Sequence, residues 1–144
     1  MATTDWPRRI DICPWGFWGH IVGGTPARTQ QAAGLGGGHL FAAPVAQDDE
    51  IGWNVPLSAG TWTLTLIHVT GPSCGIYTTK LDSTTIGTID GYSAGVTSNV
   101  VTEISGISVG SSGVYTLKLV MATKNASATD YQYRFHWITL RRTA

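Results

Sequence analysis

The chain has 144 residues, a length that suits one domain with a sizeable buried core. Charged residues make up 12% of the chain and the formal net charge is zero, so no electrostatic footprint for nucleic acid is present. The sequence also has no run of about 18 apolar residues, which argues against insertion into a membrane.

The N-terminal stretch MATTDWPRRID lacks the apolar core of a secretory signal. We therefore expect synthesis in a cytoplasm, where reducing conditions favour free thiols at Cys13 and Cys74. A disulfide between them stays open, because it needs the N-terminal arm to lie beside the strand that contains Cys74.

Residues 1–50 are irregular in pattern. Segment 11–20, DICPWGFWGH, is rich in aromatic residues without strand alternation, and a glycine-rich stretch, GLGGGH, follows at 34–39. Short strands are predicted at 40–45 and 51–57, around an acidic turn at 48–50. Pro44 and Pro56 favour edge positions for both strands, because proline lacks the N–H that a central strand donates.

The clearest strand signal lies in residues 61–70, where Trp62, Leu64 and Leu66 alternate with threonines. Two further runs, 75–81 and 84–89, are rich in β-branched residues and are separated by the polar turn Asp82-Ser83. The three segments together predict an antiparallel meander.

The second half of the chain predicts strands at 98–104, 106–109, 114–122 and 131–141. Leu117, Leu119 and Met121 share one face of the third of these strands. In the last strand, alternation places Tyr133, Phe135 and Trp137 on one face before Ile138 and Leu140 take over, which predicts a bulge or a change of exposure near Trp137.

About eight short strands at roughly ten-residue spacing predict an all-β fold, an antiparallel β-sandwich of jelly-roll type. We expect a single structural domain. Residues 1–50 would form an irregular arm and a first edge strand packed on that domain, and residues 51–144 the sandwich.

Catalytic and metal chemistry find little support in the sequence. The acidic residues closest to a pair for glycoside hydrolysis are Asp82 with Asp90, or members of the acidic turn 48–50, and Glu103 is a further weak candidate. Asp82 and Asp90 precede turn residues and suit backbone capping. The four histidines lack metal-ligand spacing, and His68 and His136 are expected to hydrogen-bond at a sheet surface. We therefore predict no enzyme activity, no cofactor and no metal site.

The order of three segments resembles a β-sandwich module of tailed-bacteriophage virion proteins: LSAGTWTLTLIHVTG, GIYTTKLDSTTIGTIDGYSAG and SGVYTLKLVMATKNASATDY. The tail FHWITLRRTA is similar to the closing strand of that module. The resemblance implies a jelly-roll sandwich displayed on a virion as a capsid decoration, head spike or tail fibre, commonly as a homotrimer. Its partners would be further copies of itself and major capsid or tail proteins.

The aromatic arm is the best candidate for function. Its rings either cap one end of the sandwich, anchor a contact with a neighbouring subunit or the capsid, or stack on a sugar. The predicted function is a non-enzymatic virion structural protein, and the alternative is a receptor-binding module that recognises host carbohydrate. The candidate interface residues are Trp6, Trp15, Phe17, Trp18, Arg141 and Arg142.

Overall fold

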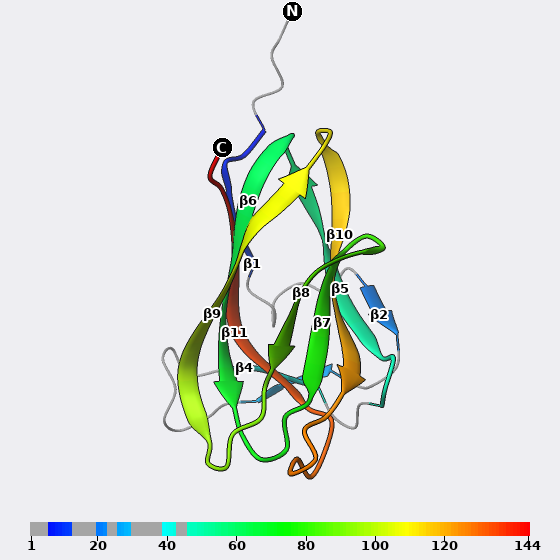
Figure 1. Cartoon of the computed structure of the whole chain (residues 1–144), viewed down its shortest axis with the longest axis vertical. Coiled ribbons are helices and arrows are strands. Elements are labelled where there is room, and N and C mark those ends of the chain that lie inside the picture. The colour runs from blue at the N-terminus through cyan, green and yellow to red at the C-terminus, as the bar shows by residue number, and fades with distance from the viewer. Residues whose placement is uncertain (1–5, 13–19, 23–25, 30–38, 43–45) are drawn as a thin grey trace, which may run out of the picture.

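The computed structural model describes residues 6–12, 20–22, 26–29, 39–42 and 46–144. Two antiparallel sheets face each other across one apolar core (Figure 1). The strands are β1 (Arg9–Ile12), β2 (His20–Val22), β3 (Pro26–Thr29), β4 (His39–Ala42), β5 (Glu50–Leu57), β6 (Gly60–Thr70), β7 (Ile76–Leu81), β8 (Thr84–Asp90), β9 (Thr97–Val109), β10 (Gly113–Thr123) and β11 (Tyr133–Arg142).

One sheet has the strand order β3-β4-β11-β6-β9, with β1 as a sixth strand paired to β11, and the other has the order β2-β5-β10-β7-β8. The predicted fold class, an antiparallel β-sandwich, is confirmed. The strands outnumber the eight or so expected because β1, β2 and β3 come from the segment predicted as an irregular arm. They are three or four residues long, too short for alternation to mark them. Strand β4 overlaps the strand predicted at 40–45, but it lies between β3 and β11, so the edge position expected for it is wrong. The division of the chain at residue 50 stays a prediction.

The alternating patterns of β6 and β10 are confirmed. Trp62, Leu64 and Leu66 are buried on β6, as are Leu117 and Leu119 on β10. Since these two strands lie in different sheets, their apolar faces meet across the sandwich and form the centre of the core.

The predicted meander is wrong. Strands β7 and β8 form a hairpin in the five-stranded sheet, whereas β6 lies in the six-stranded sheet between β11 and β9. Both edges of β6 are already paired, so the chain crosses to the opposite sheet after Thr70. Alternation shows which face of a strand is buried, but not which strand lies beside it.

Residues predicted as two strands, 98–104 and 106–109, form the single edge strand β9. Its pairing with β6 shifts register twice, and near these shifts Asn99 and Gly106 adopt positive φ angles of 61° and 72°. Left-handed residues of this kind mark bulges, so the break in alternation was real but did not end the strand.

Pro56 was predicted at a sheet edge. Its strand, β5, pairs with β10 along its length and with β2 only at residues 50–52, so within the described residues Pro56 faces an unpaired edge as expected. Pro44 lies outside the described residues. No helix in the described part of the chain is long and apolar enough to cross a membrane. Cys74 is a buried free thiol, and Cys13 is not among the described residues.

An aromatic cluster joins the two sheets near the loop end of the core. Tyr77 of β7 packs against Tyr133 and Phe135 of β11, with ring centroids 5.5 Å and 5.4 Å away. The Tyr133 hydroxyl donates to the carbonyls of Asp49 and Leu119, at 2.8 Å and 3.2 Å. Both carbonyls belong to the opposite layer, so these bonds tie the layers together.

His68 is buried in this cluster, with 1% of its surface exposed, and His136 is also buried, which corrects the expected position of both at a sheet surface. The Nε2 of His68 lies 2.9 Å from Thr102 Oγ1 and its Nδ1 lies 3.3 Å from the hydroxyl of Tyr77. Partners on both ring nitrogens make burial tolerable for the neutral imidazole. Burial, with a smaller contribution from His136, lowers the pKa of His68 to about 4.

Core truncation should destabilise the protein strongly. We expect Leu64→Ala or Leu117→Ala to lower the free energy of unfolding by about 2 to 5 kcal/mol, because each opens a cavity in a filled core. Val114→Ala, at a side chain that is 67% exposed, is the matched control and should change it by less than about 0.5 kcal/mol. Urea unfolding of the three variants measures these differences, and a loss below 0.5 kcal/mol for both leucines would contradict the assigned strand faces.

Stability should fall on acidification because of His68. An unfolded chain protonates this imidazole near pH 6.5, whereas the folded protein does so only near pH 4, so between these values protons favour the unfolded state. The loss amounts to about 3 kcal/mol across that window. Urea unfolding of the original protein and of His68→Gln gives the difference between their free energies of unfolding. This difference should become smaller as the pH falls from 7 to 4, because only the original protein loses stability through the imidazole. A difference independent of pH would contradict the shifted pKa.

Candidate functional site

A bulge in β11 decides which side chains reach the surface of the six-stranded sheet. Between Phe135 and Trp137, β11 advances two residues while β6 advances one, from His68 to Ile67. The predicted irregularity near Trp137 is thus confirmed. Phe135 points into the core before the bulge and Ile138 after it, so Trp137 turns outward, with 38% of its surface exposed.

Asp11 of β1 holds the exposed indole in place. The indole Nε1–H of Trp137 donates to Asp11 Oδ1 at 3.3 Å, and the hydroxyl of Thr139 donates to the same oxygen at 2.7 Å. The Arg9 guanidinium donates to both carboxylate oxygens, at 2.8 Å and 3.1 Å. Hydrogen bonds from Arg9 and then Thr139 hold the pKa of Asp11 below its usual value, so the carboxylate is charged at neutral pH.

Polar side chains continue across the outer face of the sheet in one row. Asp11 lies opposite Thr139, Thr139 opposite Thr65 of β6, and Thr65 opposite Glu103 of β9. The Thr65 hydroxyl donates to Glu103 Oε1 at 3.2 Å. Trp137 lies next to this row, opposite Ile67. We call this surface the Trp137 face; it consists of Asp11, Thr65, Glu103, Trp137 and Thr139.

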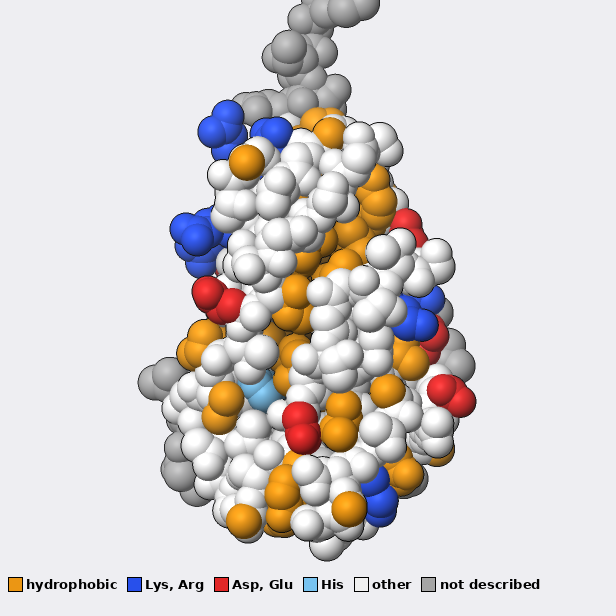
Figure 2. All heavy atoms as spheres, viewed as in Figure 1, with side chains coloured by type: hydrophobic (Ala, Val, Ile, Leu, Met, Phe, Trp, Pro, Cys, Tyr) orange, Lys and Arg blue, Asp and Glu red, His pale blue; other side chains and the backbone are white. Residues whose placement is uncertain are grey.

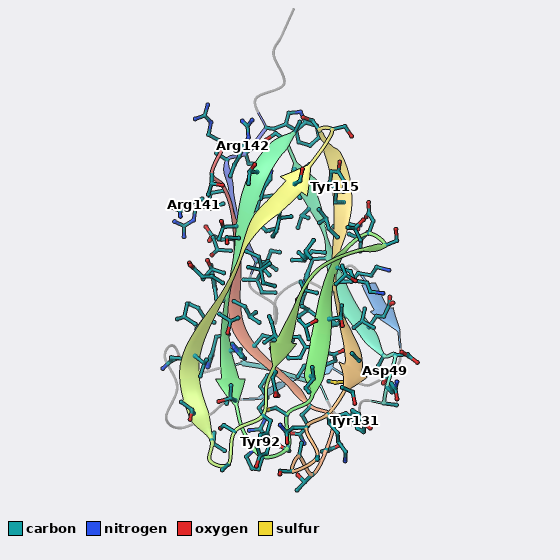
Figure 3. The ribbon with its side chains drawn as sticks, in the orientation of Figure 1. Asp49, Tyr92, Tyr115, Tyr131, Arg141 and Arg142 are labelled. Atoms are coloured by element: carbon teal, nitrogen blue, oxygen red, sulfur yellow. The ribbon has the colours of Figure 1, made fainter. Side chains whose placement is uncertain are left out.

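The arginines predicted as interface residues lie at one end of the six-stranded sheet, Arg141 on the same side as Trp137 and Arg142, by alternation, on the other side. Figure 3 shows Arg141 and Arg142 at the upper end of the sandwich, and the basic side chains of this region stand out in Figure 2. Arg141 is exposed and lies opposite Arg9 of β1, whereas Arg142 is half-buried. Trp6 is partly buried just before β1. Trp15, Phe17 and Trp18 lie outside the described residues, and the proposed contact with a neighbour stays a prediction.

A second aromatic surface lies at the opposite end, on the loops that carry Tyr92 and Tyr131 (Figure 3). Lys124 Nζ lies 5.0 Å from the ring centre of Tyr131. Beside these rings, Ser73 Oγ donates to Gln132 Oε1 at 2.7 Å, and Arg134 Nη2 donates to the same oxygen at 2.8 Å. These hydrogen bonds link the polar groups of this tyrosine end to one another.

The carboxylates of Asp82 and Asp90, considered for hydrolysis, accept hydrogen bonds from backbone N–H groups. Asp90 Oδ1 accepts the backbone N–H of Tyr92 at 2.9 Å, the turn capping that the sequence predicted. Asp82 instead accepts from the backbone of another strand, from Thr116 N at 2.7 Å, and itself adopts a φ of 52° in the turn. Within the described residues, no group of three or more His, Cys, Asp or Glu side chains could hold a metal ion.

The fold has clear counterparts among solved structures, although no protein-family model and no curated protein matches the chain. Part of a xanthan lyase from Paenibacillus is similar over 88% of this chain, with 24% identity and a TM-score of 0.71. This chain spans 12% of that enzyme's length.

Two similar structures are whole carbohydrate-binding modules. The CBM36-1 domain of a multidomain xylanase from the hindgut metagenome of Trinervitermes trinervoides matches 94% of this chain and 98% of its own, with 13% identity and a TM-score of 0.59. CsCBM6-3 from Clostridium stercorarium, solved with cellobiose, matches 93% and 94%, with 16% identity and a TM-score of 0.61. At these identities the likeness shows a shared β-sandwich fold.

The central residues of the Trp137 face were not found from the sequence. Asp11 and Trp137 are 126 positions apart, and only the pairing of β1 with β11 brings them together. The one signal in the sequence was the broken alternation at Trp137, which showed that this side chain leaves the core-facing pattern but not what it meets outside.

Proposed function

We propose that this β-sandwich is a non-catalytic carbohydrate-binding module and that the glycan lies on the Trp137 face. The observation that carries the proposal is the exposed indole of Trp137, held by the Asp11 carboxylate beside a row of polar side chains. A large ring that is exposed and already oriented is suited to binding, because little conformational freedom is lost when a ligand packs on it.

The chemistry of the face matches that of a sugar. The apolar C–H face of a pyranose ring packs on an indole, and its hydroxyls are donors and acceptors for carboxylates and threonine hydroxyls. Asp11, Thr139, Thr65 and Glu103 supply those groups across four adjacent strands. A sheet surface is open at both sides, so it suits part of a chain rather than an enclosed small molecule.

The comparisons support the same class of function. Structures similar over nearly the whole chain include carbohydrate-binding modules, among them a family 6 module from Clostridium cellulolyticum solved with xylose. The carboxylates bound to backbone N–H groups at Asp82 and Asp90 favour a binding role over a catalytic one.

Trp137→Ala should abolish most glycan binding while the fold persists, because the side chain is exposed and its loss opens no core cavity. We expect the dissociation constant for the best ligand on a glycan array, measured by calorimetry, to rise roughly 30-fold or more, as for a binding hot spot. Tyr131→Ala, at the opposite end, is the matched control and should leave affinity within about twofold. If binding is lost only in Tyr131→Ala, the site lies at the tyrosine end instead. If the original protein binds no glycan on the array, the proposed function is wrong.

A second proposal concerns location. The resemblance of residues 58–125 to modules of tailed-bacteriophage virion proteins favours a homo-oligomeric protein, most simply a trimer, carried on a virion. In that setting the glycan would be a host surface carbohydrate. Immunogold labelling of purified particles should place the protein on the head or at the tail. Label at the tail tip fits an adhesin, label on the head fits capsid decoration, and absence from intact particles would exclude the virion role.

A further inference from the structure

Four arginines gather at the end of the six-stranded sheet that borders the Trp137 face. Arg9 and Arg141 lie directly opposite each other on β1 and β11, and Arg8 and Arg142 are joined by a backbone hydrogen bond of 2.8 Å from Arg142 N to Arg8 O. We call this group the arginine end. It holds four of the nine Lys and Arg residues of a chain with no net charge. Like charges placed opposite each other destabilise a sheet, so the arrangement has a cost.

Few carboxylates balance these charges. Among the described residues, Arg9 pairs with Asp11, at 2.8 Å, while no carboxylate is paired with Arg8, Arg141 or Arg142. The described segments at this end, residues 6–9, 58–63, 107–114 and 140–144, contain no Asp or Glu. The nearest acidic groups on the face, Asp11 and Glu103, lie in the polar row and already accept hydrogen bonds. The arginine end is therefore positive, and it lies beside Glu103 and the Asp11 carboxylate that Arg9 already pairs.

The arginine end also contains a hollow of about 250 Å³, lined by Arg8, Arg142, Thr143 and Ala144. Arg142 Nε is buried and has no hydrogen-bond partner among the described residues. Its position depends on Gly60, which has a φ of 144°: a Cβ there would lie 2.5 Å from Arg142 Nε.

From these observations we infer that the Trp137 face takes an anionic glycan, one whose carboxylate or sulfate groups bind at the arginine end while a sugar ring packs on Trp137. The inference rests on the proposed function, which it narrows to a substrate class. Guanidinium groups form paired hydrogen bonds to the oxygens of a carboxylate or sulfate.

The distance between Trp137 and the arginine end sets a minimum length for the ligand. Trp137 and Arg141 lie four residues apart on β11 and on the same side of the sheet, a separation of about 13 Å. That distance exceeds one sugar ring, so the ligand is an oligosaccharide or a longer chain. Its hydroxyls would lie over the polar row and its charged substituent would lie near Arg141, because a carboxylate beside Glu103 would be repelled.

The test compares charged and neutral forms of the same polymer on the full chain. The probes are a polyuronate and its carboxyl-reduced form, and dextran sulfate and dextran, each measured by calorimetry at two salt concentrations. We expect at least tenfold tighter binding of one charged polymer than of its neutral form, with affinity falling as salt rises. The relative affinities for polyuronate and for dextran sulfate show whether the site prefers a carboxylate or a sulfate.

Two double variants locate the effect. Arg141→Gln/Arg142→Gln should remove the preference for the charged polymer. Lys80→Gln/Lys124→Gln removes the same charge from β7 and from the β10–β11 loop, and should keep that preference. Trp137→Ala should weaken binding of both forms of the polymer. Circular dichroism and unfolding midpoints check that each variant is folded.

The outcomes separate this inference from the proposed function. Charged and neutral polymers could bind equally well, with the binding of both lost in Trp137→Ala. That result would overturn the inference of an anionic glycan and leave the carbohydrate-binding function intact. Equal losses in the arginine and lysine variants would also overturn it. Charged polymer bound with no effect of Trp137→Ala, or a DNA oligonucleotide bound as tightly as polyuronate, would overturn the glycan function and leave a general anion site.

Discussion

The phenols of Tyr77 and Tyr133 fix how the two sheets of this protein lie against each other. Tyr133, from the six-stranded sheet, donates to Asp49 and Leu119 in the opposite layer, and Tyr77, from the five-stranded sheet, lies within 3.3 Å of His68. Apolar packing alone leaves sheets free to slide, whereas buried polar groups must keep their partners. Burial raises the pKa of both phenols, so they remain neutral donors. The position of β11, and of everything on its outer face, depends on these contacts.

The β11 bulge changes which residues of this strand face the core. Before it, Tyr133 and Phe135 are the inward residues, and after it Ile138 and Leu140 are. Without the extra residue Trp137 would point into a core that Trp62 and its neighbours already fill. The same shift aligns Thr139 with Asp11 and brings the indole within reach of that carboxylate. The candidate site is therefore a product of strand register, and it borders the arginine end because Arg141 follows in the same phase.

The fold class and the long strands could be predicted because an alternating pattern over ten residues, as in β6 or β10, is specified locally. The partner of each strand could not, and β7 was placed beside β6 although it belongs to the other sheet. The burial of His68 was missed because its two hydrogen-bond partners, Tyr77 and Thr102, lie on different strands. Arg141 and Arg142 were predicted as interface residues, but their proximity to Arg8 and Arg9 depends on the pairing of the first and last strands, which no local pattern encodes.

The place of β11 within its sheet has a mechanical consequence. On one side it pairs with β6 along most of its length, and on the other with β4 near its start and with β1 near its end. A load applied to a long ligand on Trp137 and Arg141 would pull along this strand and shear hydrogen bonds on both of its edges at once. A strand at the margin of the sheet, such as β9, would share the same load with hydrogen bonds on one side only. A ligand held on β11 therefore loads two neighbouring ladders of the sheet at once.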